Sequence, residues 1–271
     1  METDKMSTAS SVGAERRPLL QALIIERRIL FGCTVLVGLS AFLWITAVTT
    51  QKWVVVQCGD GIVLPKRDRY LLKSDSGLWE ICRYVFQTYA TDEKLGNVTT
   101  SPKPTSVSGL KGQYITKCTN YLAQPKLENG IPKDPAYDID VANYVRTMIS
   151  FAIISIFVMA MGCGFSTYTF MNPRYMFKRL AAGINFISTA CTFVVVQVMM
   201  STVDHLKKTV KFVYPEGAYH YYHVSFYLAW LVVAINFCAA ASFLWYSRKR
   251  KGDKAATDEL AMADEPTIIG R

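Results

Sequence analysis

Four long apolar stretches dominate the hydrophobic pattern of this chain, at residues 29–51, 147–173, 180–203 and 224–247. None of them contains a charged side chain, whereas a helix at the surface of a soluble protein would carry a polar stripe. Each is long enough to cross the roughly 30 Å hydrocarbon layer, which takes about 20 helical residues. The pattern predicts a mainly α membrane protein, with a four-helix transmembrane bundle in residues 29–246.

Basic residues gather at alternate ends of these stretches. They lie at residues 27–28, at 178–179 in the short turn between the second and third stretches, and at 248–251 after the fourth. Because loops rich in Lys and Arg stay in the cytosol, we expect a cytosolic N-terminal tail at 1–28 and a cytosolic C-terminal tail at 247–271, both irregular. We therefore attribute the net charge of +9 to membrane topology and to contact with lipid headgroups. Nucleic acid is not an expected partner.

A cleaved signal peptide ending near Ala47 is the alternative interpretation of the first stretch. Its apolar run is longer than the about 7–15 residues of a signal peptide core, and the sequence at 46–50 is a poor cleavage site. These two departures favour a retained span.

The long loop at residues 51–145 carries the patterns of β-strands. Residues 52–56 are rich in β-formers, and from Gly77 to Arg83 the side chains alternate between two faces. Residues 84–89 and 114–118 are the next strand candidates. We therefore expect a small extracellular antiparallel β-sheet above the bundle.

Three cysteines, Cys58, Cys82 and Cys118, lie in this loop, which the topology places in an oxidising compartment. Three is an odd number, so at most one disulfide forms among them. Cys82 and Cys118 lie in strand-like segments, whereas Cys58 precedes the turn residues 59–61. We expect a Cys82–Cys118 disulfide, with Cys58 either free or linked to a partner.

The loop also contains the sequon Asn97-Val98-Thr99. Such tripeptides occur often by chance, but this one lies on the segment already assigned to the outside. We therefore expect Asn97 to be glycosylated.

Polar side chains in the third stretch form one helical face, made of Asn185, Ser188, Thr189 and Thr192. Gln197 lies about a third of a turn away from this face. Amides in hydrocarbon need hydrogen-bond partners. We expect the four-residue face to be satisfied inside the bundle and take Gln197 as the candidate for contact with another protein.

Small residues recur in two spans and predict close helix packing within the bundle rather than partner binding. They are Ala160, Gly162, Gly164 and Ser166 in the second span, and Ala234, Cys238 and Ser242 in the fourth.

The sequence lacks any pattern that indicates catalysis. It has no Gly-rich phosphate loop and no His-Glu-x-x-His, and none of its three histidines has metal-ligand spacing to a cysteine. Asp204 and His205 stand together at the end of a span, where we expect them to be solvated. We predict neither an enzyme nor a metal or cofactor site. The spans also lack carboxylates, which argues against a carrier working alone.

Four spans, Trp53, then Gly77-Leu78-Trp79 and Cys82 with a later Cys118, resemble the superfamily of claudins, peripheral myelin protein and calcium-channel γ subunits. Within it the chain looks most similar to the γ subunits of voltage-gated calcium channels, particularly the skeletal-muscle type. The local features that carry this likeness are the run 77–82 (with Glu80 where Arg is usual), the run 117–121, Val198-Met199 with the later Lys207-Lys208, and Tyr221-Tyr222 leading into Ser225-Phe226.

The resemblance implies an auxiliary subunit of the plasma membrane. Such a subunit binds beside a voltage sensor of the pore-forming subunit, chiefly through its second and third spans, and shifts channel gating. A claudin-like junction or adhesion protein that self-associates is the alternative. Two departures from claudins favour the channel: Cys118 lies far from Cys82, and the C-terminal residues 268–271 end in Arg, which makes a poor PDZ ligand.

Overall fold

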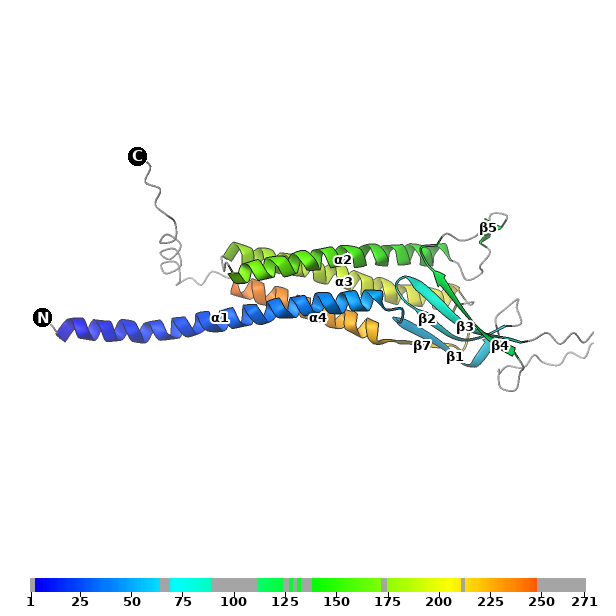
Figure 1. The fold of residues 1–271 in the computed structure, drawn as a ribbon, viewed down its shortest axis with the longest axis horizontal. Coiled ribbons are helices and arrows are strands. Elements are labelled where there is room, and N and C mark those ends of the chain that lie inside the picture. Colours follow the sequence, from blue (N-terminus) through cyan, green and yellow to red (C-terminus); the bar gives the residue numbers. More distant parts are fainter. Residues whose placement is uncertain are drawn as a thin grey trace, which may run out of the picture.

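The computed structural model combines four long helices with a sheet at one end of the bundle (Figure 1). The residues that the structure describes are 3–63, 69–88, 112–123, 127–128, 131–132, 138–171, 175–210 and 213–247.

The four helices are α1 (Thr3–Thr49), α2 (Ile139–Met171), α3 (Tyr175–Thr209) and α4 (Val224–Tyr246). Each contains a stretch long and apolar enough to cross a membrane. They lie side by side along the long axis of the molecule (Figure 1). The beginning of α1 and the end of α4 both lie at the end opposite the sheet. The prediction of a four-span bundle with a small antiparallel sheet is confirmed.

Polar side chains on the inner faces of the helices join spans that are distant in sequence. Trp44 of α1 donates its indole N–H to Ser155 Oγ of α2 at 2.7 Å. Ser40 of α1 donates to Asn236 Oδ1 of α4 at 3.2 Å. All four residues are fully buried. Because water is excluded there, such bonds favour one rotational position of each helix over the others.

The helix α1 extends through residues 3–28, so the expectation of an irregular N-terminal segment is wrong. Between Ala14 and Arg28 most residues are Leu, Ala, Glu and Arg, which are strong helix formers, and the helix continues through Pro18 into the span. Near the end of the bundle, Glu26 forms a half-buried ion pair with Lys178 of α3. This pair holds the first and third helices together at that level.

The sheet has five antiparallel strands in the order β4-β3-β2-β1-β7. They are β1 (Val54–Val63), β2 (Arg69–Ser76), β3 (Glu80–Thr88), β4 (Gly112–Asn120) and β7 (Tyr219–Tyr222), and β5 (Leu127–Glu128) pairs separately with β6 (Ile131–Pro132). Strands were expected in the regions of β1, β3 and β4. Strands β2 and β7 were not predicted from the sequence.

Strand β1 is irregular in its second half, where the sequence pattern indicated a turn. Its pairing with β2 shifts register between Gln57 and Ile62. Gly59 and Gly61 have φ angles of 57° and 97°, which other residues rarely adopt. The chain therefore bulges directly after Cys58 and then continues as a strand.

The small residues of the spans do not all pack inside the bundle. In α2, Gly162 and Ser166 are buried, whereas Ala160 and Gly164 face outward. In α4 the predicted internal stripe is wrong: Ala234 and Cys238 are exposed and Ser242 is half-buried. The buried face of α4 instead contains Asn236, the small residues Ser225, Ala229, Ala239 and Ala240, and the larger Phe226, Val232 and Phe243. The bond from Ser40 to Asn236 fixes that side toward the bundle.

Candidate interaction sites

Two tryptophans, Trp53 and Trp79, cover the C-terminal end of α1. Trp53 donates its indole N–H to the Ala47 carbonyl, and Trp79 donates to the Val48 carbonyl, both at 2.8 Å. The last carbonyls of a helix have no partner within the helix, so these donors satisfy groups that would otherwise lack one. Thr50 Oγ1 also donates to the Ala47 carbonyl. Trp53 is fully buried and packs edge-on against Trp44.

Gly77 allows the sheet to approach the end of α1 closely. A Cβ at this position would lie 2.8 Å from Cα of Gln51, closer than atoms pack in proteins. The Gly77 amide donates to the Glu80 carbonyl, so residues 77–79 form the hairpin turn between β2 and β3. The expectation that the strand begins at Gly77 is therefore wrong by three residues. Leu78, in this turn, is fully buried.

Cys82 of β3 and Cys118 of β4 are directly opposite each other in the sheet and form a disulfide. It closes the long excursion between these strands. The excursion contains Asn97, which lies outside the described residues. Cys58 is a free, buried thiol, and burial raises its pKa to about 11. Such a thiol is a poor nucleophile, because the thiolate is the reactive form.

The polar face of α3 is buried as a whole; its members are Asn185, Ser188, Thr189 and Thr192. The Asn185 amide donates to the Ala181 carbonyl at 2.9 Å and to Ser166 Oγ of α2 at 3.4 Å. Asn185 Oδ1 and Ser188 Oγ have no hydrogen-bond partner within the described part of the chain. Gly162 leaves the space for this amide, since a Cβ there would lie 3.0 Å from Asn185 Oδ1.

Gln197 lies outside this buried face. It is half-buried, one helical turn beyond Phe193 and one before Ser201, both of which are exposed. Phe193 packs edge-on against Trp230 of α4, at 5.9 Å between ring centroids. Among the described residues, none forms a hydrogen bond with the Gln197 amide. The structure thus separates Gln197 from the Asn185 face without showing what it contacts.

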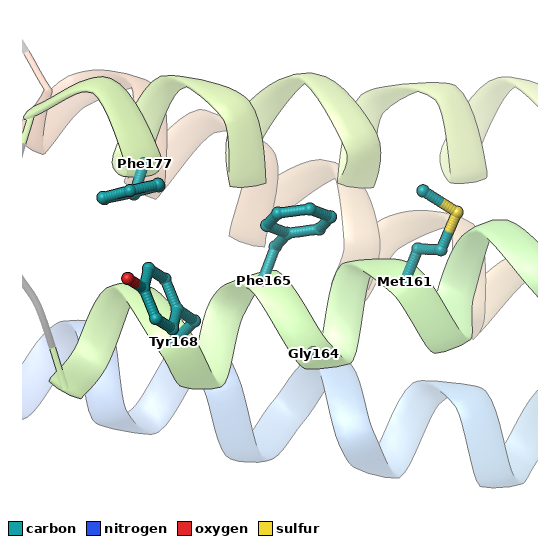
Figure 2. Close-up of a pocket in the computed structure, with 5 residues that line it drawn as sticks. All are labelled: Met161, Gly164, Phe165, Tyr168 and Phe177. Carbon is teal, nitrogen blue, oxygen red and sulfur yellow. The ribbon is translucent and has the colours of Figure 1, made fainter.

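An open apolar groove of about 540 Å³ lies between α2 and α3 (Figure 2). Met161, Phe165 and Tyr168 of α2 and Phe177 of α3 project into it, and Gly164 leaves room on the α2 side. The Tyr168 and Phe177 rings pack edge-on, with 4.9 Å between their centroids. The walls are almost entirely apolar and carry one hydroxyl, that of Tyr168, so they do not identify one partner.

The structure brings together one group of side chains that the sequence analysis did not connect. His205, expected to be solvated, is half-buried and contacts Asp138 across 3.2 Å. Asp140 lies close to both. His205 is 67 residues from Asp138, and no short spacing links them. The two residues come together because α2 and α3 are antiparallel, so the beginning of α2 lies beside the end of α3.

The family model described as PMP-22/EMP/MP20/Claudin tight junction matches residues 38–245. The matched region contains the last part of the first span, the second and third spans, all but the last residue of the fourth, and the whole five-stranded sheet. No curated protein matches the chain at a significant level.

Proposed function

Because the chain belongs to the PMP-22/EMP/MP20/claudin family, we propose that it is a non-enzymatic auxiliary subunit of a voltage-gated calcium channel. In this proposal it lies in the plasma membrane with both termini in the cytosol and binds the pore-forming subunit through its spans. The resemblance of residues 77–82 and 117–121 to the γ subunits supports this choice within the family.

The observation that carries the proposal is the half-buried position of Gln197, which lies off the buried Asn185 face and has no hydrogen bond within the described part of the chain. A primary amide within a membrane span gains from a hydrogen-bond partner, so an interaction of Gln197 with a neighbouring helix would stabilise it. The flanking outward residues, Phe193 and Ser201, provide a contact surface on both sides. A transmembrane partner with a polar group at this depth would match the surface better than lipid does.

A bound subunit shifts gating only if it binds one state of the channel more tightly than another. Couplings of about 1–3 kcal/mol are typical, which corresponds to roughly 5–150-fold in an equilibrium constant. One interhelical hydrogen bond in a membrane contributes about 0.6–2 kcal/mol. A bond from Gln197 that forms in one gating state only would therefore account for a measurable part of the coupling.

The test is voltage-clamp recording of a calcium channel with and without this subunit, scored on the midpoint of steady-state inactivation. We expect the wild type to move the midpoint and Gln197→Leu to move it less, at equal surface expression. Ser242→Ala is the matched control, because this hydroxyl of α4 bonds only to the Cys238 carbonyl of its own helix. A wild type that reaches the surface, does not co-purify with the channel and leaves the midpoint unchanged contradicts the proposal for that channel.

A junction or adhesion protein is the second candidate, and two observations favour it. The matching family description names the tight junction. Strand β4 forms one edge of the described sheet, and the ring of Tyr114 on it is 71% exposed. Such an edge can pair with another chain, including a second copy of this one. Accumulation of the protein at contacts between cells that express it alone would support this function over the first.

A further inference from the structure

We propose that Asp138, Asp140 and His205 form a binding site for a divalent transition-metal ion, with Zn²⁺ as the best match. The site lies where the first turn of α2 meets the last turns of α3, at the end of the bundle that carries the sheet. The inference does not depend on the proposed channel function.

The separations between the ligand atoms suit a metal of this size. His205 Nε2 lies 3.2 Å from Asp138 Oδ2. Zinc bonds to nitrogen and oxygen are about 2.0–2.2 Å long, so two ligands of a tetrahedral zinc are about 3.3–3.5 Å apart. The Asp138–His205 pair is therefore already close to the required spacing. One ligand atom from each of the three residues lies within 4.8 Å of the others.

The third ligand, Asp140, can move close enough to the Asp138–His205 pair to bind the same ion. Asp140 is exposed at the first turn of α2, so its side chain can rotate toward the pair without disturbing the core. With it in place, the site has three protein ligands and an open position for water, the arrangement common in zinc sites that bind exogenous ligands.

Neighbouring groups hold the two partly buried ligands in position. Asp138 Oδ1 accepts the backbone N–H of Asp140 at 2.9 Å, which directs its other oxygen, Oδ2, toward His205. The Tyr144 ring packs edge-on against the His205 imidazole at 5.7 Å between centroids. Both contacts restrict rotation of the ligands before any ion arrives.

The donor set selects the class of ion. Imidazole nitrogen is a common ligand for Zn²⁺, Cu²⁺ and Ni²⁺, whereas Mg²⁺ and Ca²⁺ bind almost entirely through oxygen. Two carboxylates neutralise the charge of one divalent ion. A Zn²⁺ ion bound here would join the start of α2 to the end of α3, two elements now connected by the Asp138–His205 contact.

The test uses the purified full chain, treated with chelator and then titrated with Zn²⁺ by calorimetry. Co²⁺ absorption is recorded in parallel, because its visible bands report a nitrogen- and oxygen-coordinated tetrahedral ion. We expect one Zn²⁺ per chain, and at least tenfold weaker binding in both His205→Gln and Asp140→Asn. Asp140→Asn keeps the test valid if His205→Gln folds poorly, because Asp140 is exposed.

His223→Gln is the matched control, since its side chain makes no capping bond to α4 and lies outside the cluster. It should bind Zn²⁺ as the wild type does. Equal Zn²⁺ affinity in wild type and Asp140→Asn, or no Co²⁺ bands with wild type, would overturn the proposal. Tighter binding of Ca²⁺ than of Zn²⁺ would overturn the assignment of the ion class.

Discussion

Replacing Trp53 with Phe tests how the sheet is attached to the first span. The indole of Trp53 is fully buried, packs edge-on against Trp44 at 6.2 Å between centroids, and donates to the Ala47 carbonyl. Phenylalanine keeps an aromatic ring but removes the N–H and part of the volume. The substitution therefore removes one hydrogen bond and leaves a small cavity.

The expected loss of stability is about 2–3 kcal/mol. The Ala47 carbonyl keeps its bond from Thr50 Oγ1, so the lost hydrogen bond costs only about 1 kcal/mol. The cavity left by the missing ring atoms adds about 1–2 kcal/mol in a site that cannot fill with water. In domains of 150–250 residues, slightly smaller than this chain of 271, 1 kcal/mol corresponds to about 2–4 °C in Tm, so we expect a fall of roughly 4–12 °C.

The assay is thermal unfolding of the purified protein in detergent, followed by the fraction that remains monodisperse after heating. Trp79→Phe is the informative comparison, because Trp79 bonds the adjacent Val48 carbonyl but is only half-buried. We expect it to lose about 0.5–1.5 kcal/mol. Trp230→Phe, at an exposed position on α4, should be close to wild type. A larger loss in Trp79→Phe than in Trp53→Phe would refute the view that burial of the ring dominates.

Cys82→Ser should lower stability by about 2–5 kcal/mol and reduce surface delivery; peptide mapping without reduction should recover the intact Cys82–Cys118 pair. Asn97→Gln should no longer shift in apparent mass on glycosidase treatment, whereas wild type should, and an unshifted wild type would contradict the assigned glycan. Gly162→Ala should lower Tm relative to Gly164→Ala, because an added Cβ meets the Asn185 amide at the first position and nothing within 4 Å at the second; equal Tm values would show that Asn185 moves freely.

The four spans could be predicted because a segment that crosses the hydrocarbon layer as a single helix must be long and almost free of charge. Strands β3 and β4 could be predicted from period-two patterns and their cysteines. Strand β2 was missed because Arg69–Ser76 contains Lys73 and Asp75, and nothing local marks it as the centre of a sheet. Strand β7 was missed because Tyr219–Tyr222 has the composition of an interfacial aromatic belt. Its pairing with β1 is a tertiary contact across more than 150 residues.

Which side of a span packs inside the bundle was harder to predict than the presence of the span. Small residues permit close packing but do not require it, so the stripe Ala234, Cys238 and Ser242 was assigned to the wrong side of α4. Asn236 was the informative residue, because a buried amide must find a partner in its own bundle, and it found Ser40. The cluster of Asp138 and His205 could not be predicted at all, since it depends on which helix ends meet.

The polar residues of the spans differ in how their hydrogen bonds are satisfied, and this difference bears on the transmembrane partner proposed above. Many inward groups bond across the bundle, as in the Ser40–Asn236 and Trp44–Ser155 pairs, or within their own helix, as the Asn185 N–H does. Asn185 Oδ1 and Ser188 Oγ are the exceptions, since they have no partner within the described part of the chain. Gln197 is half-buried off the Asn185 face and has no hydrogen bond within the described part of the chain, whereas the exposed amide Asn143 lies in the first turns of α2, near the end of its span. A bundle that only had to be stable would gain from leucine there. Under the proposed function the Gln197 amide bonds to a group outside the bundle, so Gln197→Leu should raise the thermal stability of the isolated protein while it weakens the transmembrane complex.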